Sequence, residues 1–120
     1  NIAIASAFLK HHPEITRFLD EVARILSPGG LFFALDPRPF VVSIGMIFGR
    51  FNPKTNPSLW TKRSIVDALA KERIPLRVEA YYRYWVAPTR SIYDTGVERL
   101  IPGFIASHIA LHQCLVLRRA

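Results

Sequence analysis

Few side chains in this 120-residue sequence could take part in acid–base, nucleophilic or metal chemistry, and the first candidate is His11. It stands between a short apolar run and Pro13. Because imidazole exchanges a proton near neutral pH, His11 could act as a catalytic base or line a binding site. The alternative is a histidine that hydrogen-bonds the backbone where a helix starts. Its neighbour His12 is expected at the surface.

Other candidates for this chemistry are interpreted as structural. His108 and His112 are four residues apart, which is a metal-binding spacing on a helix. His112 falls in a predicted strand, however, where that spacing separates the rings, and no carboxylate or second cysteine is near in sequence. We therefore predict no metal site. Cys114 lies inside an apolar run, which is typical of an inert core thiol.

A fold has to position these residues, and two continuous apolar runs predict its centre. Residues 2–9 and 31–35 are typical of strands buried in a parallel sheet. Between them, residues 14–26 carry apolar side chains at helical spacing, and residues 27–30 form a turn. This order predicts a right-handed βαβ unit whose two strands are adjacent and parallel.

The second half predicts two more strands, 76–86 and 109–117, which form an antiparallel pair extending the sheet. The first of them alternates, and one face is predicted to carry Leu76, Val78, Ala80, Tyr82, Tyr84 and Val86. The expected fold class is therefore α/β. Helices are predicted over residues 40–51, from an N-cap at Thr61 to about residue 73, and from Ser91 to about Ile101.

The run IASAFLKHHPEITRFLDEVARILSPGGLFFALDP, residues 4–37, resembles one part of the class I S-adenosylmethionine-dependent methyltransferases, of the methyltransferase type 11 kind. It is similar to the fourth strand, the following helix and the fifth strand of that family, with the LSPGG turn as the most specific part. The later elements match the sixth and seventh strands. The resemblance covers nearly the whole chain and implies a partial Rossmann-like methyltransferase fold.

This resemblance places residues 1–120 as the C-terminal portion of a single methyltransferase domain, with an insert or lid at about 38–60. The family's glycine-rich loop and the ribose-binding acid of its second strand are absent, and no Gly-x-Gly occurs in the chain. Asn1 stands where the family often has Asp, and Pro75 lies near a common turn glycine. The start at Asn1 favours a piece of a longer enzyme. The isolated chain is expected to bind S-adenosylmethionine weakly or not at all.

The resemblance also implies a cofactor, S-adenosylmethionine, and a set of site residues. Ligands of open parallel sheets bind beyond the carboxyl ends of the strands. Ala5, Ser6 and Ala7 are the expected cofactor contacts because their small side chains let the backbone approach closely. His11 is the candidate base.

The expected acceptor is a small, partly apolar molecule, either lipid-like or aromatic with an acidic group. It would contact the residues after the second strand and in the insert, which are Asp36, Arg38, Phe40, Phe48 and Trp60. The apolar segment 40–51 is bracketed by Arg38 and Arg50, so it could be a lid over an apolar acceptor. It could also be a helix that lies on a membrane surface, or an ordinary helix packed on the sheet.

Composition leaves other functions open. The net charge is +7, but the basic residues are scattered, so nucleic acid is not the expected partner. Peripheral membrane contact and a homo-oligomer paired along an open sheet edge remain possible partners. With a single cysteine and no signal peptide or spanning segment, a cytoplasmic protein is expected, with a location peripheral to a membrane as the alternative. The alternative functions are a truncated non-catalytic remnant or a basic module that docks on membrane or RNA.

Overall fold

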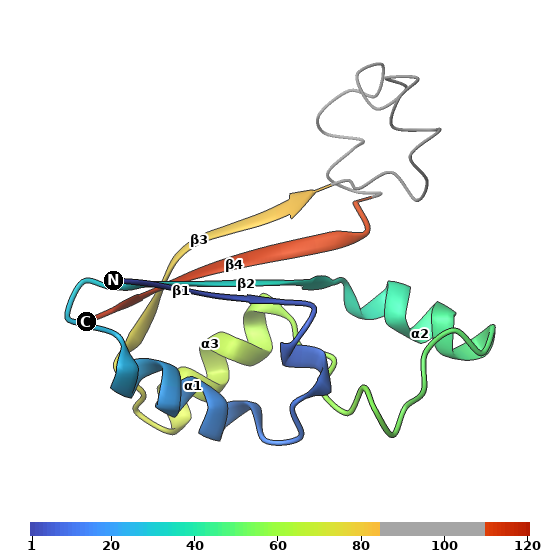
Figure 1. Cartoon of the computed structure of the whole chain (residues 1–120), viewed down its shortest axis with the longest axis horizontal. Helices are drawn as coiled ribbons and strands as arrows, with labels where there is room; N and C mark the ends of the chain where they lie inside the picture. Colours follow the sequence, from blue (N-terminus) through green and yellow to red (C-terminus); the bar gives the residue numbers. More distant parts are fainter. Residues whose placement is uncertain (85–109) are drawn as a thin grey trace, which may run out of the picture.

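In the computed structural model, residues 1–84 and 110–120 are described. They form a four-stranded sheet with helices on one side (Figure 1). The elements in chain order are β1 Ile2–Ser6, the 3-10 helix η1 Leu9–His11, α1 Ile15–Ile25, β2 Leu31–Pro37, α2 Pro39–Ile47, α3 Lys62–Lys71, β3 Leu76–Tyr84 and β4 His112–Arg119. The predicted helix from Ser91 to Ile101 lies outside the described residues.

The sheet has the strand order β1-β2-β4-β3. β1 and β2 are parallel and in register from Ile2 beside Leu31 to Ser6 beside Leu35. β4 is antiparallel to both β2 and β3. The predicted α/β fold, with its adjacent parallel strands and its added antiparallel pair, is confirmed.

Several predicted strand ends are wrong. β4 runs over His112–Arg119 rather than over residues 109–117, and the two differences in the first half of the chain each have a local cause. β1 stops at Ser6 rather than at residue 9, because Ala7 adopts a left-handed backbone with φ 52° and η1 follows. Leu9 is apolar because it packs in the core, where it is fully buried, and not because it belongs to a strand. β2 continues past residue 35 to Pro37, which still pairs with His112 of β4.

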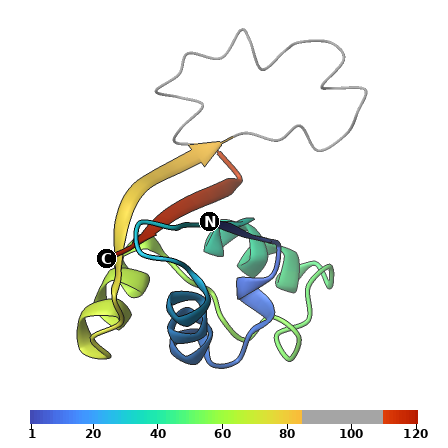
Figure 2. The same cartoon turned by 60° about the vertical axis from the view of Figure 1, so that its left-hand side comes forward.

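The hydrophobic core lies between one face of the sheet and the helices α1 and α3 (Figures 1 and 2). Phe32 and Leu115 point into it from the sheet, while Leu19 of α1 and Ile65 of α3 come from the other side. Each of these side chains is at most 2% exposed. The opposite face carries Ile2 and Ile4, which are 65% and 68% exposed, and no described helix covers it.

A β-bulge in β3 overturns the predicted alternation of that strand. Val78 pairs with Leu117, but the next paired residue is Ala80, opposite Val116, so Glu79 is the extra residue. After the bulge, Tyr81 lies beside Leu115 on the core face and Tyr82 points the other way, 58% exposed. Sequence alternation had placed Tyr82 with Leu76 and Val78. A bidentate ion pair from Arg118 to Glu79, with N–O distances of 3.0 Å, holds the inserted residue.

The ends of α3 follow from two local features. Thr61 is its N-cap, as predicted: its side chain accepts from the Ser64 N–H, and the Ser64 hydroxyl accepts from the Thr61 N–H. At the other end Arg73 has φ 54°, a left-handed conformation in which a residue with a Cβ is strained. This is the position after a helix where glycine is usual.

Replacing this strained residue should stabilise the protein. We expect Arg73→Gly to raise the free energy of unfolding by roughly 0.5–1 kcal/mol, because glycine adopts this backbone without strain and loses part of the gain to its greater unfolded-state entropy. Urea denaturation measures the difference. Arg73→Ala is the matched control, since it removes the same side chain but keeps the Cβ. Equal stability of the two variants would contradict the strain argument.

Candidate functional site

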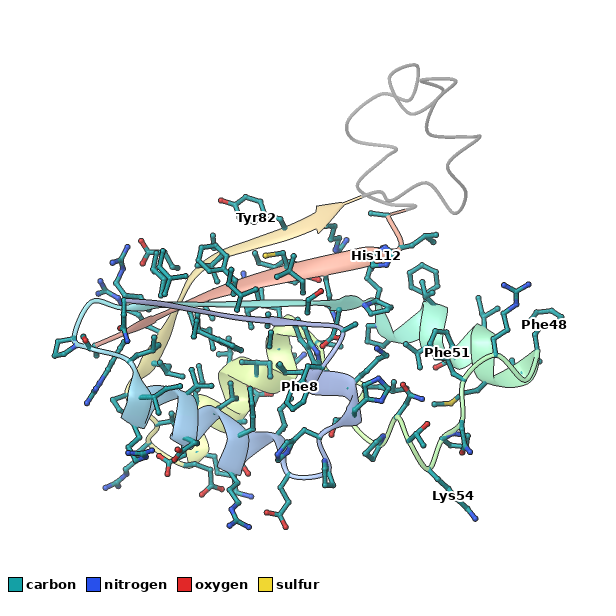
Figure 3. The ribbon with its side chains drawn as sticks, viewed as in Figure 1. Phe8, Phe48, Phe51, Lys54, Tyr82 and His112 are labelled. Carbon is teal, nitrogen blue, oxygen red and sulfur yellow. The ribbon has the colours of Figure 1, made fainter. Side chains whose placement is uncertain are left out.

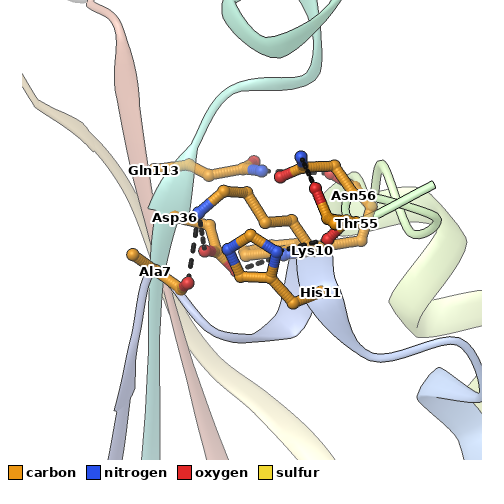
Figure 4. A network of polar contacts seen from close by, with 8 residues as sticks. Ala7, Lys10, His11, Asp36, Thr55, Asn56 and Gln113 are labelled. Carbon is orange, nitrogen blue, oxygen red and sulfur yellow. Dashed lines mark hydrogen bonds and ion pairs between the residues drawn. The ribbon is translucent and has the colours of Figure 1, made fainter. Parts of the chain in front are cut away.

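A buried carboxylate, Asp36, lies at the carboxyl end of β2 and organises the polar groups around it (Figure 4). The residue is 1% exposed. Trp60 Nε1 donates a hydrogen bond of 2.8 Å to its Oδ2, and Lys10 Nζ lies 3.9 Å from its Oδ1. Lys10 is itself only 5% exposed and donates to the Ala7 carbonyl at 3.1 Å. An ion pair therefore joins the turn after β1 to the end of β2.

Burial sets the charge balance of this pair. It raises the pKa of the Asp36 carboxyl, while the hydrogen bond from Trp60 and the positive charge of Lys10 act in the opposite direction. Oδ1 has no hydrogen-bond partner, so the ammonium of Lys10 is its main compensation. The ionised carboxylate is thus held at a cost that its neighbours only partly offset.

A second set of hydrogen bonds extends this cluster across the sheet. Gln113 of β4, 1% exposed, donates from Nε2 to the Trp60 carbonyl at 3.0 Å. Its Oε1 accepts from the Tyr81 hydroxyl at 3.0 Å. Neither Lys10 nor Gln113 was predicted from the sequence to belong to a site. Each is a polar residue directly beside an apolar run, which marks a strand end but does not reveal the partner.

His11 lies at the end of η1 and is exposed. Its Nδ1 bonds to the Thr55 carbonyl, and since a carbonyl only accepts, Nδ1 must carry the proton. In the neutral ring, Nε2 then keeps its lone pair. His12, which is half-buried and not at the surface as expected, accepts at 3.2 Å from the Glu14 N–H where α1 begins. His11 thus makes a hydrogen bond to the backbone through Nδ1 and keeps Nε2 as a nitrogen that can take a proton.

The loop between α2 and α3 lies against this turn. Ser58 N–H donates to the Lys10 carbonyl at 3.1 Å, and the Ser58 hydroxyl donates to the His12 carbonyl. Together with the His11–Thr55 bond, these contacts fix the second half of the predicted insert, residues 52–60, on η1. The first half, α2, extends beyond the end of β2 (Figure 1).

The three predicted cofactor residues lie together at the carboxyl end of β1. Ala5 is buried in the core, while Ser6 and Ala7 are exposed. A hollow of about 350 Å³ lies beside this strand end and is lined by Ile4, Ala5, Ser6, Phe8 and Phe18. The hollow has small residues on one side and two aromatic rings on the other.

The five predicted acceptor residues divide into three places. Asp36 and Trp60, 1% and 3% exposed, are bonded to each other below the surface, so we place them among the residues that hold the site together. Arg38 and Phe40 form a surface pair, with the guanidinium carbon 4.8 Å from the ring centroid. Phe48 lies apart at the far end of α2, 76% exposed (Figure 3).

His112 also reaches this edge of the sheet, beside Pro37, and is half-buried. Burial lowers the pKa of its imidazole, and the negative charge of Asp36 opposes that effect. Burial raises the pKa of the Cys114 thiol, which disfavours the reactive thiolate. Over residues 1–84 and 110–120, no group of three or more His, Cys, Asp or Glu side chains could hold a metal ion.

Comparison with known proteins places the fold. No protein-family profile matches the chain, and no curated protein matches its sequence. Among solved structures, the chain is similar to an S-adenosylmethionine-dependent methyltransferase from Mesorhizobium loti, with a TM-score of 0.61 and 16% identity. The match covers 98% of this chain and 61% of that one. The sheet and its helices therefore form part of a Rossmann-like methyltransferase fold.

Removing Lys10 from the buried ion pair should reveal the free-energy cost of burying the Asp36 carboxylate. We expect Lys10→Met to lower the free energy of unfolding by about 3–5 kcal/mol at pH 7, because the Asp36 carboxylate stays buried without a counterion. Adding Asp36→Asn should recover most of that loss, since the amide oxygen still accepts from Trp60. The exposed Lys71→Met is the control.

The same variant should depend on pH in a defined direction. Because burial raises the pKa of Asp36, the folded protein takes up this proton before the unfolded chain does as the pH falls. The deficit of Lys10→Met should therefore shrink between pH 7 and the folded pKa of Asp36. Urea denaturation at several pH values measures it, and a deficit that does not change with pH would contradict this assignment.

Proposed function

We propose that the protein containing this chain transfers a methyl group from S-adenosylmethionine to a small, partly apolar acceptor. The observation that carries the proposal is the fold, because the match to a methyltransferase of known structure spans 98% of the chain. The predicted cofactor contacts lie at the carboxyl end of β1. Ligands of this kind of sheet bind at that end. Bound there, the cofactor supplies a methyl group already activated by a sulfonium charge.

The residues beside β1 fit such a cofactor. Ser6 and Ala7 have small side chains, so a ligand can approach their backbone closely. The hollow that Ser6 lines is also lined by the rings of Phe8 and Phe18, whose centroids lie 5.4 Å apart. Aromatic rings of this kind suit a flat heterocycle such as adenine.

His11 is the proposed base for an acceptor that must lose a proton. The bond from Nδ1 to Thr55 fixes the ring and its tautomer, and Nε2 is then the nitrogen that would take the proton. The loop 52–60, hydrogen-bonded to η1, would keep water away from this side of the site.

A bulky side chain at the end of β1 should block the cofactor. In the natural protein that contains residues 1–120, we expect Ser6→Phe to weaken S-adenosylmethionine binding at least tenfold, because the ring fills the hollow. Isothermal titration calorimetry measures this. Ile2→Phe is the control, since Ile2 is exposed on the same face of β1 but does not line the hollow. Unchanged affinity in Ser6→Phe would place the cofactor elsewhere.

A second candidate function is docking on an anionic membrane through α2. Ile47 and Phe48 at its end are 80% and 76% exposed, and Figure 3 shows Phe48 projecting from the molecule, with Lys54 on the following loop. From residue 37 to residue 66 the sequence has five basic residues and no acidic one. No helix within the described residues could cross a membrane. An exposed apolar tip flanked by cations is typical of a helix that lies on a bilayer surface.

Vesicle sedimentation tests this second candidate. We expect the protein to sediment with vesicles of phosphatidylserine and phosphatidylcholine, and much less with phosphatidylcholine alone, because the anionic lipid attracts the basic residues. Phe48→Asp should reduce the bound fraction severalfold. Ile25→Asp, a change at a 51% exposed apolar residue of α1, should not. Equal binding of the two variants would contradict docking through α2.

A further inference from the structure

A second cavity lies at the same end of the sheet as the hollow beside β1, but next to β3. Its volume is about 720 Å³, and it lies between the start of α2, the start of α3 and the end of β3. Two of its residues, Arg38 and Phe40, are predicted acceptor contacts. It is lined by Arg38, Pro39, Phe40, Thr61, Lys62, Arg63, Val66, Tyr81, Arg83 and Gln113, and we call it the cationic cleft.

Four of the residues that line the cationic cleft are basic, and no lining residue is acidic. Aromatic rings hold three of these cations. Lys62 Nζ and the guanidinium carbon of Arg83 each lie 5.9 Å from the Tyr81 ring centroid. The guanidinium carbon of Arg38 lies 4.8 Å from the ring of Phe40. Like charges gathered at one cavity repel one another, so a bound anion would be favoured there.

The polar groups of Tyr81 and Gln113 in the cationic cleft already have hydrogen-bond partners within the protein. The Tyr81 hydroxyl donates to Gln113, and Gln113 donates to the Trp60 carbonyl, so the ring of Tyr81 is held in place while its polar end is occupied. Lys62 and Arg83 lie over this ring, so a flat ligand would stack there with its anionic group drawing the two cations aside. Phe40 and Val66 add apolar surface at 40% and 41% exposure.

The start of α3 adds uncharged donors to the cleft. The reciprocal bonds between Thr61 and Ser64 satisfy the backbone N–H groups of both residues. Lys62 and Arg63 are the first two residues of α3, where backbone N–H groups have no partner within the helix. They belong to the first turn of the helix, where the helix dipole also favours negative charge.

We propose that the cationic cleft binds a flat organic anion, with its ring on Tyr81 and its carboxylate or phosphate between Lys62 and Arg83. That this ligand is the methyl acceptor rests on the proposed function. The binding itself does not, because it needs neither the cofactor nor turnover. The apolar walls select a ring or similar flat body, and the basic residues select a single anionic group attached to it.

Titration of the ¹⁵N-labelled protein, followed by ¹H–¹⁵N spectra, tests the proposal with three probes. These are 2-naphthoate, 2-naphthyl phosphate and the neutral 2-naphthamide. We expect at least one anion to shift the signals of residues 61–66, 81–83 and 113, and to bind at least tenfold more tightly than the amide. The stronger of the two anions identifies the group that the cleft prefers.

Charge reversal supplies the matched variants. Lys62→Glu and Arg83→Glu should each weaken binding of the preferred anion at least tenfold, whereas Lys71→Glu, at the other end of the same helix, should leave it unchanged. All three residues are exposed, so the variants should fold, and their melting curves check this. Equal binding of the amide, shifts confined to residues 2–6 or 44–48, or an equal loss in Lys71→Glu would each overturn the proposal. Failure of Ser6→Phe to affect S-adenosylmethionine would bear on the proposed function only.

Discussion

The arrangement of the residues at the carboxyl ends of β1 and β2 depends on the compensation of one buried negative charge. Asp36 is the next-to-last residue of β2, one of the two inner strands, and lies in an interior where an ionised group is costly unless it is paired. Lys10 comes to it from the turn after β1, and Trp60 comes from the loop before α3. The two partners are far apart in the sequence, so compensation of this one carboxylate requires both connections to lie where they do. Gln113 then ties the loop to β4.

This fixed edge separates two different environments. Beside β1 is a hollow with small and aromatic side chains and no ionisable group. Beside β3 is the cationic cleft. The strand order places β2 and β4 between the two, with the Asp36–Lys10 pair below the surface.

Much of the fold could be predicted from the sequence because the signals were local. The apolar runs of β1 and β2, the amphipathic helix between them and the cap at Thr61 each depend on neighbouring residues only. The site was less predictable because burial and pairing depend on distant residues. Asp36 and Arg38 were both recognised as strand-end residues, but only the structure distinguishes the buried carboxylate from the half-buried guanidinium. Lys10 gave no sign that its charge would be enclosed.

The alternation of β3 was the other point at which sequence reasoning failed, and the bulge responsible also determines what the cationic cleft can bind. Tyr81 and Tyr82 are adjacent and identical, so composition does not decide which of them faces Gln113 and α3. The single unpaired residue, Glu79, decides it. Deleting that residue would leave a regular strand with Tyr81 still inward, whereas straightening the strand with Glu79 retained would turn Ala80 and Tyr82 inward. The ligand preference of this cleft therefore depends on one inserted residue in β3. A relative with the same residues around the cleft but without the β-bulge would place a different side chain than Tyr81 in it.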